Sequence, residues 1–97
     1  TAIVVLAALV NAMKLVKKPL HGLKVIINGA GAAGSSIARL LMSSGISNII
    51  LCDCMGILYR GMESEDAEKQ AMAAITNPDN IKGTLADAMK NADVFIG

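Results

Sequence analysis

The apolar residues of this chain form short runs and one helical stripe that together predict alternating strands and helices. Residues 25–27 and 49–52 are continuously apolar, which is typical of strands in a parallel sheet that is covered on both faces. Between them, small and apolar residues recur at helical spacing from Gly34 to Leu41. The pattern therefore predicts a strand, a helix and a second strand.

The helical stripe also predicts which side of this helix is buried. Ile37, Ala38 and Leu41 continue the stripe and are expected to pack on the sheet. Gly45 is well placed to end the helix just after its last turn. The residues expected on the outer face are Ser35, Ser36 and Arg39.

Both ends of the chain follow the same alternation. Residues 1–16 lack glycine and proline and are apolar over most of the helical circumference, so a helix buried nearly all round is expected at about residues 1–17. Near the other end, Thr84 with Asp87 three residues on predicts a short helix from Thr84 to Asn91, followed by a strand at residues 94–96. The apolar start and the stop after a strand suggest a piece of a longer protein.

The stretch from residue 55 to residue 82 is ambiguous. The segment between Gly56 and Gly61 is either an extended excursion or a small hairpin. A helix is expected to begin at residues 64–66, where Ser, Glu and Asp occur, and to end at Asn77-Pro78. The inner stripe expected for this helix is Ala67, Ala71 and Ile75.

A glycine motif joins the first strand to its helix. Gly29, Gly31 and Gly34 match G-x-G-x-x-G: the first permits the tight turn, the second leaves room for a pyrophosphate, and the third lets the helix pack closely. The amides of Ala32 and Ala33 are then expected to point at the phosphates, because a helix N-terminus can hold an anion without Lys or Arg. We therefore interpret this stretch as a dinucleotide-binding βαβ unit; the alternative is a purely structural glycine turn.

An acidic residue ends the second strand. Asp53 lies 19 residues beyond Gly34, close to the offset at which an acidic side chain reaches the adenosine ribose. Its carboxylate favours NAD over NADP, whose 2′-phosphate brings like charge. Neither Cys54 nor Met55 is basic, so Arg60 is the remaining candidate for a compensating charge, although a solvated loop role is expected for it. The alternative for Asp53 is a turn residue.

Composition narrows the remaining classes. The 97 residues suffice for one small domain, and a net charge of +1 without a basic block gives no support for nucleic-acid binding. The apolar opening at residues 2–10 is too short to span a bilayer. Cys52 and Cys54 would share a strand face and are expected to be free thiols, which points to a cytoplasmic protein. His21 is expected at the surface, and no metal cluster is expected.

Four stretches of the chain together resemble the cofactor-binding domain of bacterial-type malic enzymes across essentially all 97 residues. They are TAIVVLAALVNAMKLV, KVIINGAGAAGSSIARLL, NIILCDCMGILYRG and ITNPDNIKGTLADAMKNADVFIG. The resemblance implies that residues 1–97 form part of an NAD(P)-binding domain. Its fold would be a Rossmann-like, doubly wound parallel sheet, incomplete, with about three core strands and flanking helices.

The resemblance also implies an activity for the parent protein. Members of the family oxidise L-malate with NAD or NADP and, with a divalent metal (Mg or Mn), decarboxylate it to pyruvate and carbon dioxide. Thr1 matches the end of a family segment that carries a metal ligand, and the catalytic Tyr and Lys lie upstream in that pattern, so Tyr59 is not the catalytic tyrosine. The implied cofactor-binding residues are Gly29, Gly31, Ala32, Ala33, Gly34 and Asp53, with Gly97 on the nicotinamide side.

The expected partners are a dinucleotide, L-malate in the parent enzyme and further copies of the parent in a homo-oligomer. The piece alone is expected to be inactive, with no catalytic or metal-binding residue of its own. Two other functions remain open: a nucleotide-binding regulatory module without catalysis, and a domain kept for subunit contacts. Val4, Leu6 and Leu9 are the candidate contact residues for the latter.

Overall fold

The computed structural model describes residues 22–63 and 66–97, together with Val4, Ala8 and Asn11, which are helical. Most of the helix expected at about residues 1–17 therefore lies outside the described residues, as do His21 and the expected helix start at residues 64–65. The rest of the expected organisation can be compared with the structure element by element.

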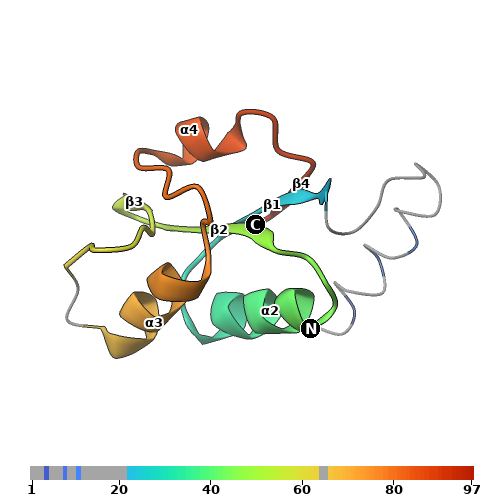
Figure 1. Cartoon of the computed structure of the whole chain (residues 1–97), viewed down its shortest axis with the longest axis horizontal. Coiled ribbons are helices and arrows are strands. Elements are labelled where there is room, and N and C mark those ends of the chain that lie inside the picture. Colours follow the sequence, from blue (N-terminus) through green and yellow to red (C-terminus); the bar gives the residue numbers. More distant parts are fainter. Residues whose placement is uncertain (1–3, 5–7, 9–10, 12–21, 64–65) are drawn as a thin grey trace.

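Strands and helices alternate along the described chain, as the apolar pattern predicts (Figure 1). The strands expected at 25–27 and 49–52 are each extended by a residue or more, and the expected final strand is present. The elements are β1 (Lys24–Asn28), α2 (Ala32–Ser43), β2 (Asn48–Asp53), β3 (Gly56–Ile57), α3 (Ala67–Ile75), α4 (Leu85–Met89) and β4 (Val94–Ile96).

The sheet has the order β3-β2-β1-β4, with β1 parallel to both β2 and β4. β3 pairs with β2 in the antiparallel direction, so β2 and β3 form a hairpin whose turn lies at residues 54–55. The segment between Gly56 and Gly61 is therefore not a hairpin of its own, because Gly56 and Ile57 form the second arm of this one. Because β2 lies on one side of β1 and β4 on the other, the direction in which the sheet grows reverses at β1. In open α/β sheets, ligands bind outside the carboxyl ends of the strands at such a switch point.

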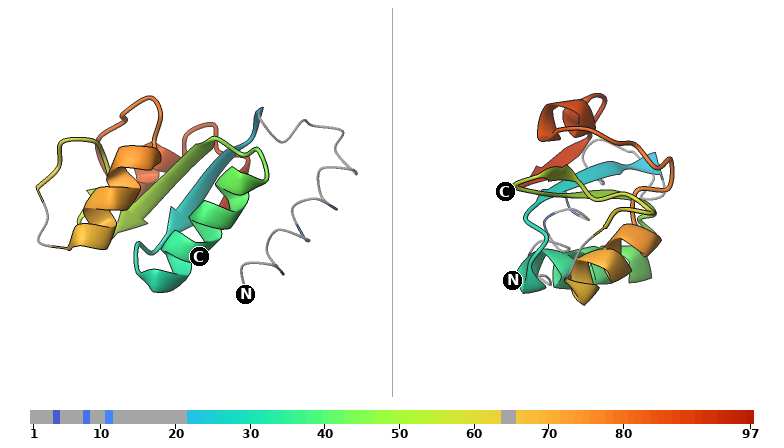
Figure 2. Two further views of the ribbon diagram at one scale, coloured as in Figure 1. Left: turned by 60° about the horizontal axis from the view of Figure 1, so that its bottom comes forward. Right: turned by 90° about the vertical axis from the view of Figure 1, so that its left-hand side faces the viewer.

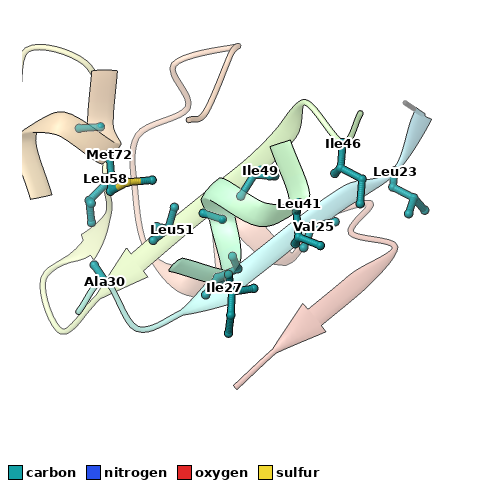
Figure 3. Close-up of a cluster of buried hydrophobic side chains, with 13 residues drawn as sticks. Leu23, Val25, Ile27, Ala30, Leu41, Ile46, Ile49, Leu51, Leu58 and Met72 are labelled. Carbon is teal, nitrogen blue, oxygen red and sulfur yellow. The ribbon is translucent and has the colours of Figure 1, made fainter. Parts of the chain in front are cut away.

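Helices cover both faces of this sheet, which explains why its strands are apolar throughout. α2 and α3 lie on one face and α4 on the other (Figure 2). Val25 and Ile27 belong to the larger cluster under α2 and α3 (Figure 3). Ile26 belongs instead to a smaller cluster that includes Ala88 of α4. Burial of alternate residues on opposite faces leaves no solvated side on β1.

Local capping sets where the two shorter helices begin. The Asp66 carboxylate accepts hydrogen bonds from the amides of Glu68 and Lys69 at the start of α3. Thr84 and Asp87 form the expected capping box at the start of α4, although this helix ends at Met89, earlier than expected. The expected end of α2 is also confirmed: Ser44 is its C-cap.

The expected orientations of α3 and of Ser35 were wrong. The residues expected to face inward on α3 are exposed: Ala67, Ala71 and Ile75. The helix instead buries Met72 and Ala73. The Met72 side chain is longer than that of an alanine and fills more space beside Leu58. In α2, the outward prediction holds for two of its three residues; Ser35 is only 3% exposed. Its small side chain fits into a buried face wider than the apolar stripe.

Candidate functional site

The loop between β1 and α2 is built by backbone contacts. Gly29 has a φ of +134°, a conformation that strongly favours glycine, and its amide donates a 2.8 Å hydrogen bond to the Cys52 carbonyl of β2. A Cβ on Gly34 would collide with the Gly29 carbonyl oxygen, whereas the nearest sheet atom, on Ile27, would lie at an ordinary 3.6 Å. The close approach predicted for Gly34 is therefore to the loop backbone rather than to the sheet.

Gly31 differs from these two glycines because nothing in the described protein requires it. Its backbone is extended, with φ −79° and ψ −166°, which any residue can adopt. A Cβ built on it would meet no heavy atom within 4 Å. The space that a side chain would fill is thus left open at the start of α2.

The start of α2 also differs from the starts of α3 and α4. Its N-cap is Gly31, which offers no side-chain hydrogen bond, and no acidic residue lies in the first turn. Both α3 and α4, by contrast, are capped by side-chain oxygens and carry an acid there. The first amides of α2 therefore have no side-chain cap, and the positive end of the helix dipole is uncompensated in the described part of the chain. Such an end is suited to an anion.

A hollow of about 320 Å³ lies in front of this helix start. The five loop residues predicted to hold a cofactor line this hollow together with Ile96 and Gly97 at the carboxyl end of β4. The lining residues are Ile27, Asn28, Gly29, Gly31, Ala32, Ala33, Gly34, Ile37, Ile96 and Gly97.

Asp53 lies at the end of the neighbouring strand and lines a different hollow, of about 390 Å³. Its side chain is 11% exposed. One carboxylate oxygen accepts a 2.8 Å hydrogen bond from the Met55 amide, and the other lies 3.0 Å from the Lys69 ammonium. Apart from Asp53, the lining residues are Met55, Ile57, Tyr59, Met62, Glu63 and Lys69.

These contacts set the charge at the end of β2. Burial by itself raises the pKa of the Asp53 carboxyl, but the hydrogen bond and charge of Lys69 and the amides of Met55 and Gly56 outweigh it, so the pKa lies below its usual range. The same hydrogen bond raises the pKa of Lys69. Asp53 and Lys69 are therefore an ionised pair at neutral pH, and the corner carries no net charge from the two.

Lys69 is the site residue that the sequence reasoning missed, whereas Arg60 is exposed and has the loop role that was expected for it. The Arg60 guanidinium donates to the carbonyls of Asn77 and Pro78, at 3.4 and 3.1 Å, in the loop after α3. The sequence feature that could have indicated Lys69 is Asp66, because an N-cap at Asp66 places Lys69 in the first turn of α3. The prediction that Ala67, Ala71 and Ile75 face inward gave the helix the wrong rotation, so Lys69 was not considered.

The two cysteines do not share a strand face as expected, because Cys54 follows the end of β2. Cys52 is buried and Cys54 exposed, and both are free thiols. Burial, and then the charge of Asp53, raise the pKa of Cys52.

Within residues 22–63 and 66–97, no cluster of three His, Cys, Asp or Glu side chains could hold a metal ion. No helix in these residues is long and apolar enough to cross a membrane.

A mostly parallel sheet with a switch point, a glycine loop and a helix start without a side-chain cap together define a dinucleotide-binding domain of the Rossmann type. The family model described as "Malic enzyme, NAD binding domain" matches residues 1–97. The chain thus belongs to the NAD-binding domain family of malic enzymes, as the sequence resemblance predicts. This membership supports the enzyme interpretation over the regulatory and subunit-contact alternatives.

Several relatives agree. The chain is 46% identical over 97 residues to a protein of Geobacillus stearothermophilus named NAD-dependent malic enzyme, covering 100% of this chain and 20% of that protein. It is 37% identical over 99 residues to the NADP-dependent malic enzyme of Escherichia coli K12, covering 100% of this chain and 13% of that protein. The chain therefore spans a fifth or less of the length of these two relatives.

Solved structures agree on the fold. The crystal structure of an NAD-dependent malic enzyme from Thermotoga maritima superposes with a TM-score of 0.93 at 40% identity, covering 99% of this chain and 26% of that one. The malic enzyme of Entamoeba histolytica gives a TM-score of 0.87 at 36% identity, covering 98% and 21%. The predicted Rossmann-like fold is confirmed, with the antiparallel β3 added at one edge.

Proposed function

We propose that this domain, residues 1–97 as part of a longer NAD(P)-binding domain, binds NAD across the carboxyl ends of β2, β1 and β4. The protein that carries it would oxidise and decarboxylate L-malate to pyruvate and carbon dioxide. One observation carries the proposal most directly. The space that a side chain at position 31 would fill is empty, and it lies in front of a helix start without a side-chain cap. A pyrophosphate has the charge and the bulk to use both features.

Each part of the cofactor has a proposed position. The amides of Ala32, Ala33 and Gly34 would hold the pyrophosphate, with Gly29 shaping the loop and Gly31 leaving the room. Gly97 would lie on the nicotinamide side, because it closes the same hollow from β4. When bound, the nicotinamide ring accepts a hydride from the substrate.

The adenosine half would occupy the hollow at the end of β2. Asp53 would accept hydrogen bonds from the ribose hydroxyls, since its neighbour Cys52 is paired with Asn28 at the start of the glycine loop. Met55, Ile57 and Tyr59 provide apolar surface in the same hollow for the adenine ring. The Asp53 carboxylate already accepts hydrogen bonds from Lys69 and from the amides of Met55 and Gly56, but a carboxylate has about four acceptor positions.

The proposal includes a preference for NAD over NADP, and Lys69 is expected to reduce that preference. Asp53 alone would repel a 2′-phosphate, whereas the ammonium 3.0 Å from it supplies a compensating charge on the same side of the ribose. We therefore propose a preference for NAD that is smaller than an unpaired carboxylate would give. That NAD-dependent and NADP-dependent relatives match the same chain is consistent with a small difference.

We assign the acid-base groups and the divalent metal of the reaction to parts of the parent protein outside this chain. The described residues offer no suitable cluster for a metal, so no step of the decarboxylation is derived from them. The parent would be a cytoplasmic homo-oligomer. The contribution of this chain is to bind and orient the cofactor.

The test uses the full-length protein that carries this domain. Calorimetry should detect binding of NAD, and malate supplied with NAD and Mn²⁺ should produce NADH, pyruvate and carbon dioxide in equal amounts. A protein that binds NAD but produces no pyruvate from malate would overturn the proposed reaction. A protein that binds neither NAD nor NADP would overturn the cofactor site as well.

A further inference from the structure

Asn28, the last residue of β1, is a polar residue whose side chain has no structural role in the described protein. It is exposed, while the three residues before it are buried. Asn at the end of a strand often bonds a nearby backbone amide to form a turn. Here the adjacent backbone amide, of Gly29, donates to the Cys52 carbonyl instead. No hydrogen bond joins the Asn28 side-chain amide to any residue that the structure describes.

The Asn28 side chain lies on the face of the sheet opposite to α2. Val25 and Ile27 face the cluster under α2, so by alternation along β1 the Asn28 side chain faces the same side as Ile26, toward α4. Asn28 nevertheless lines the hollow of the glycine loop, together with Ile96 and Gly97. It therefore lies at the switch point, beside β4.

This position fits one half of a dinucleotide better than the other. If the adenosine occupies the hollow of Asp53 beyond β2, then the ligand must run from the pyrophosphate toward β4, where Asn28 and Gly97 meet. A side-chain amide offers two donors and one acceptor, which matches the hydroxyl groups of a ribose.

We infer that Asn28 binds the nicotinamide-ribose half of the cofactor through its side-chain amide. The inference rests on the proposed function, because it assumes that a dinucleotide occupies this hollow. It adds a binding residue just outside the glycine motif, at a position that the motif leaves unspecified.

The test compares a whole dinucleotide with its adenosine half. In the full-length protein, Asn28→Ala should weaken NAD binding, measured by calorimetry, about fivefold to tenfold, as expected for one lost hydrogen bond. Binding of ADP, which has the adenosine and the pyrophosphate but no nicotinamide ribose, should change less than about twofold. Asn48→Ala is the matched control, since Asn48 begins β2 at the opposite end of the sheet and should leave both affinities unchanged.

The outcomes separate this inference from the proposal beneath it. Loss of NAD affinity with ADP affinity retained supports the contact. Equal loss for both ligands would place Asn28 at the pyrophosphate and overturn the inference, as would unchanged NAD binding with a normal melting temperature. Failure of the unmodified protein to bind NAD or ADP would instead overturn the cofactor site itself.

Discussion

The glycine loop and the Asp53 corner lie on adjacent strands of one sheet but are built in different ways. The loop is one contiguous segment, and its features are backbone features: a positive φ at Gly29, a close approach at Gly34 and an open space at Gly31. The corner at Asp53 depends on side-chain charge brought from α3 by Lys69. Substitutions in the loop should therefore change whether a dinucleotide binds, and substitutions in the corner should change which one binds.

Gly34→Ala should have the largest effect, because its Cβ would collide with the Gly29 carbonyl and push the start of α2 away from the loop. We expect a loss of about 3 kcal/mol in the free energy of unfolding, together with loss of NAD binding. Urea unfolding followed by circular dichroism measures the first and calorimetry the second. A variant of unchanged stability would show that the loop and helix are not held in contact.

Gly31→Val should separate binding from folding. The backbone angles at Gly31 suit any residue and the space is open, so stability should change by less than about 1 kcal/mol. The valine would occupy the room left for the pyrophosphate, so NAD affinity should fall at least about a hundredfold. Ser47→Val, at an exposed position before β2, is the control for adding a valine. Equal NAD affinity in Gly31→Val and the parent would remove the phosphate-loop hypothesis.

Lys69→Gln and Asp53→Ser should move cofactor preference in opposite directions. Removing the ammonium leaves Asp53 without its partner, so the preference for NAD over NADP should widen about tenfold. Removing the carboxylate leaves Lys69 free to attract a 2′-phosphate, so the preference should narrow or reverse. The ratio of kcat/KM values for the two cofactors in the full-length protein measures both effects. A shift of the same sign in the two variants would contradict opposing roles for the pair.

Arg60→Ala should have the smallest effect on cofactor choice. Its guanidinium contacts carbonyls of the loop after α3 rather than the hollow of Asp53, so the NAD to NADP ratio should change by less than about twofold. Thermal unfolding should report a small loss of stability, since the contacts that it makes are local. If this variant alone abolished a preference, Arg60 rather than Lys69 would be the charge that acts on the ribose.

The sequence by itself determined the loop and its two strands. Continuous apolar runs require burial on both faces, and a glycine spacing between a strand and a helix leaves few alternatives, so β1, α2, β2 and the register of the motif could all be predicted from local pattern. The capping box at Thr84 was equally local. These features depend on residues close together in the chain.

The tertiary structure alone decided which distant residues meet. The hydrogen bonds of Lys69 to Asp53 and of Arg60 to Asn77 and Pro78 join residues 16 to 18 positions apart. Whether the first of these bonds forms depends on the rotation of α3 about its axis, because Lys69 lies on that helix. Several apolar stripes were possible on that alanine-rich helix, and burial of Met72 selected one that turns Lys69 toward the end of β2. Sequence periodicity gives the spacing of a helix face, but only packing against the sheet fixes which face is inside.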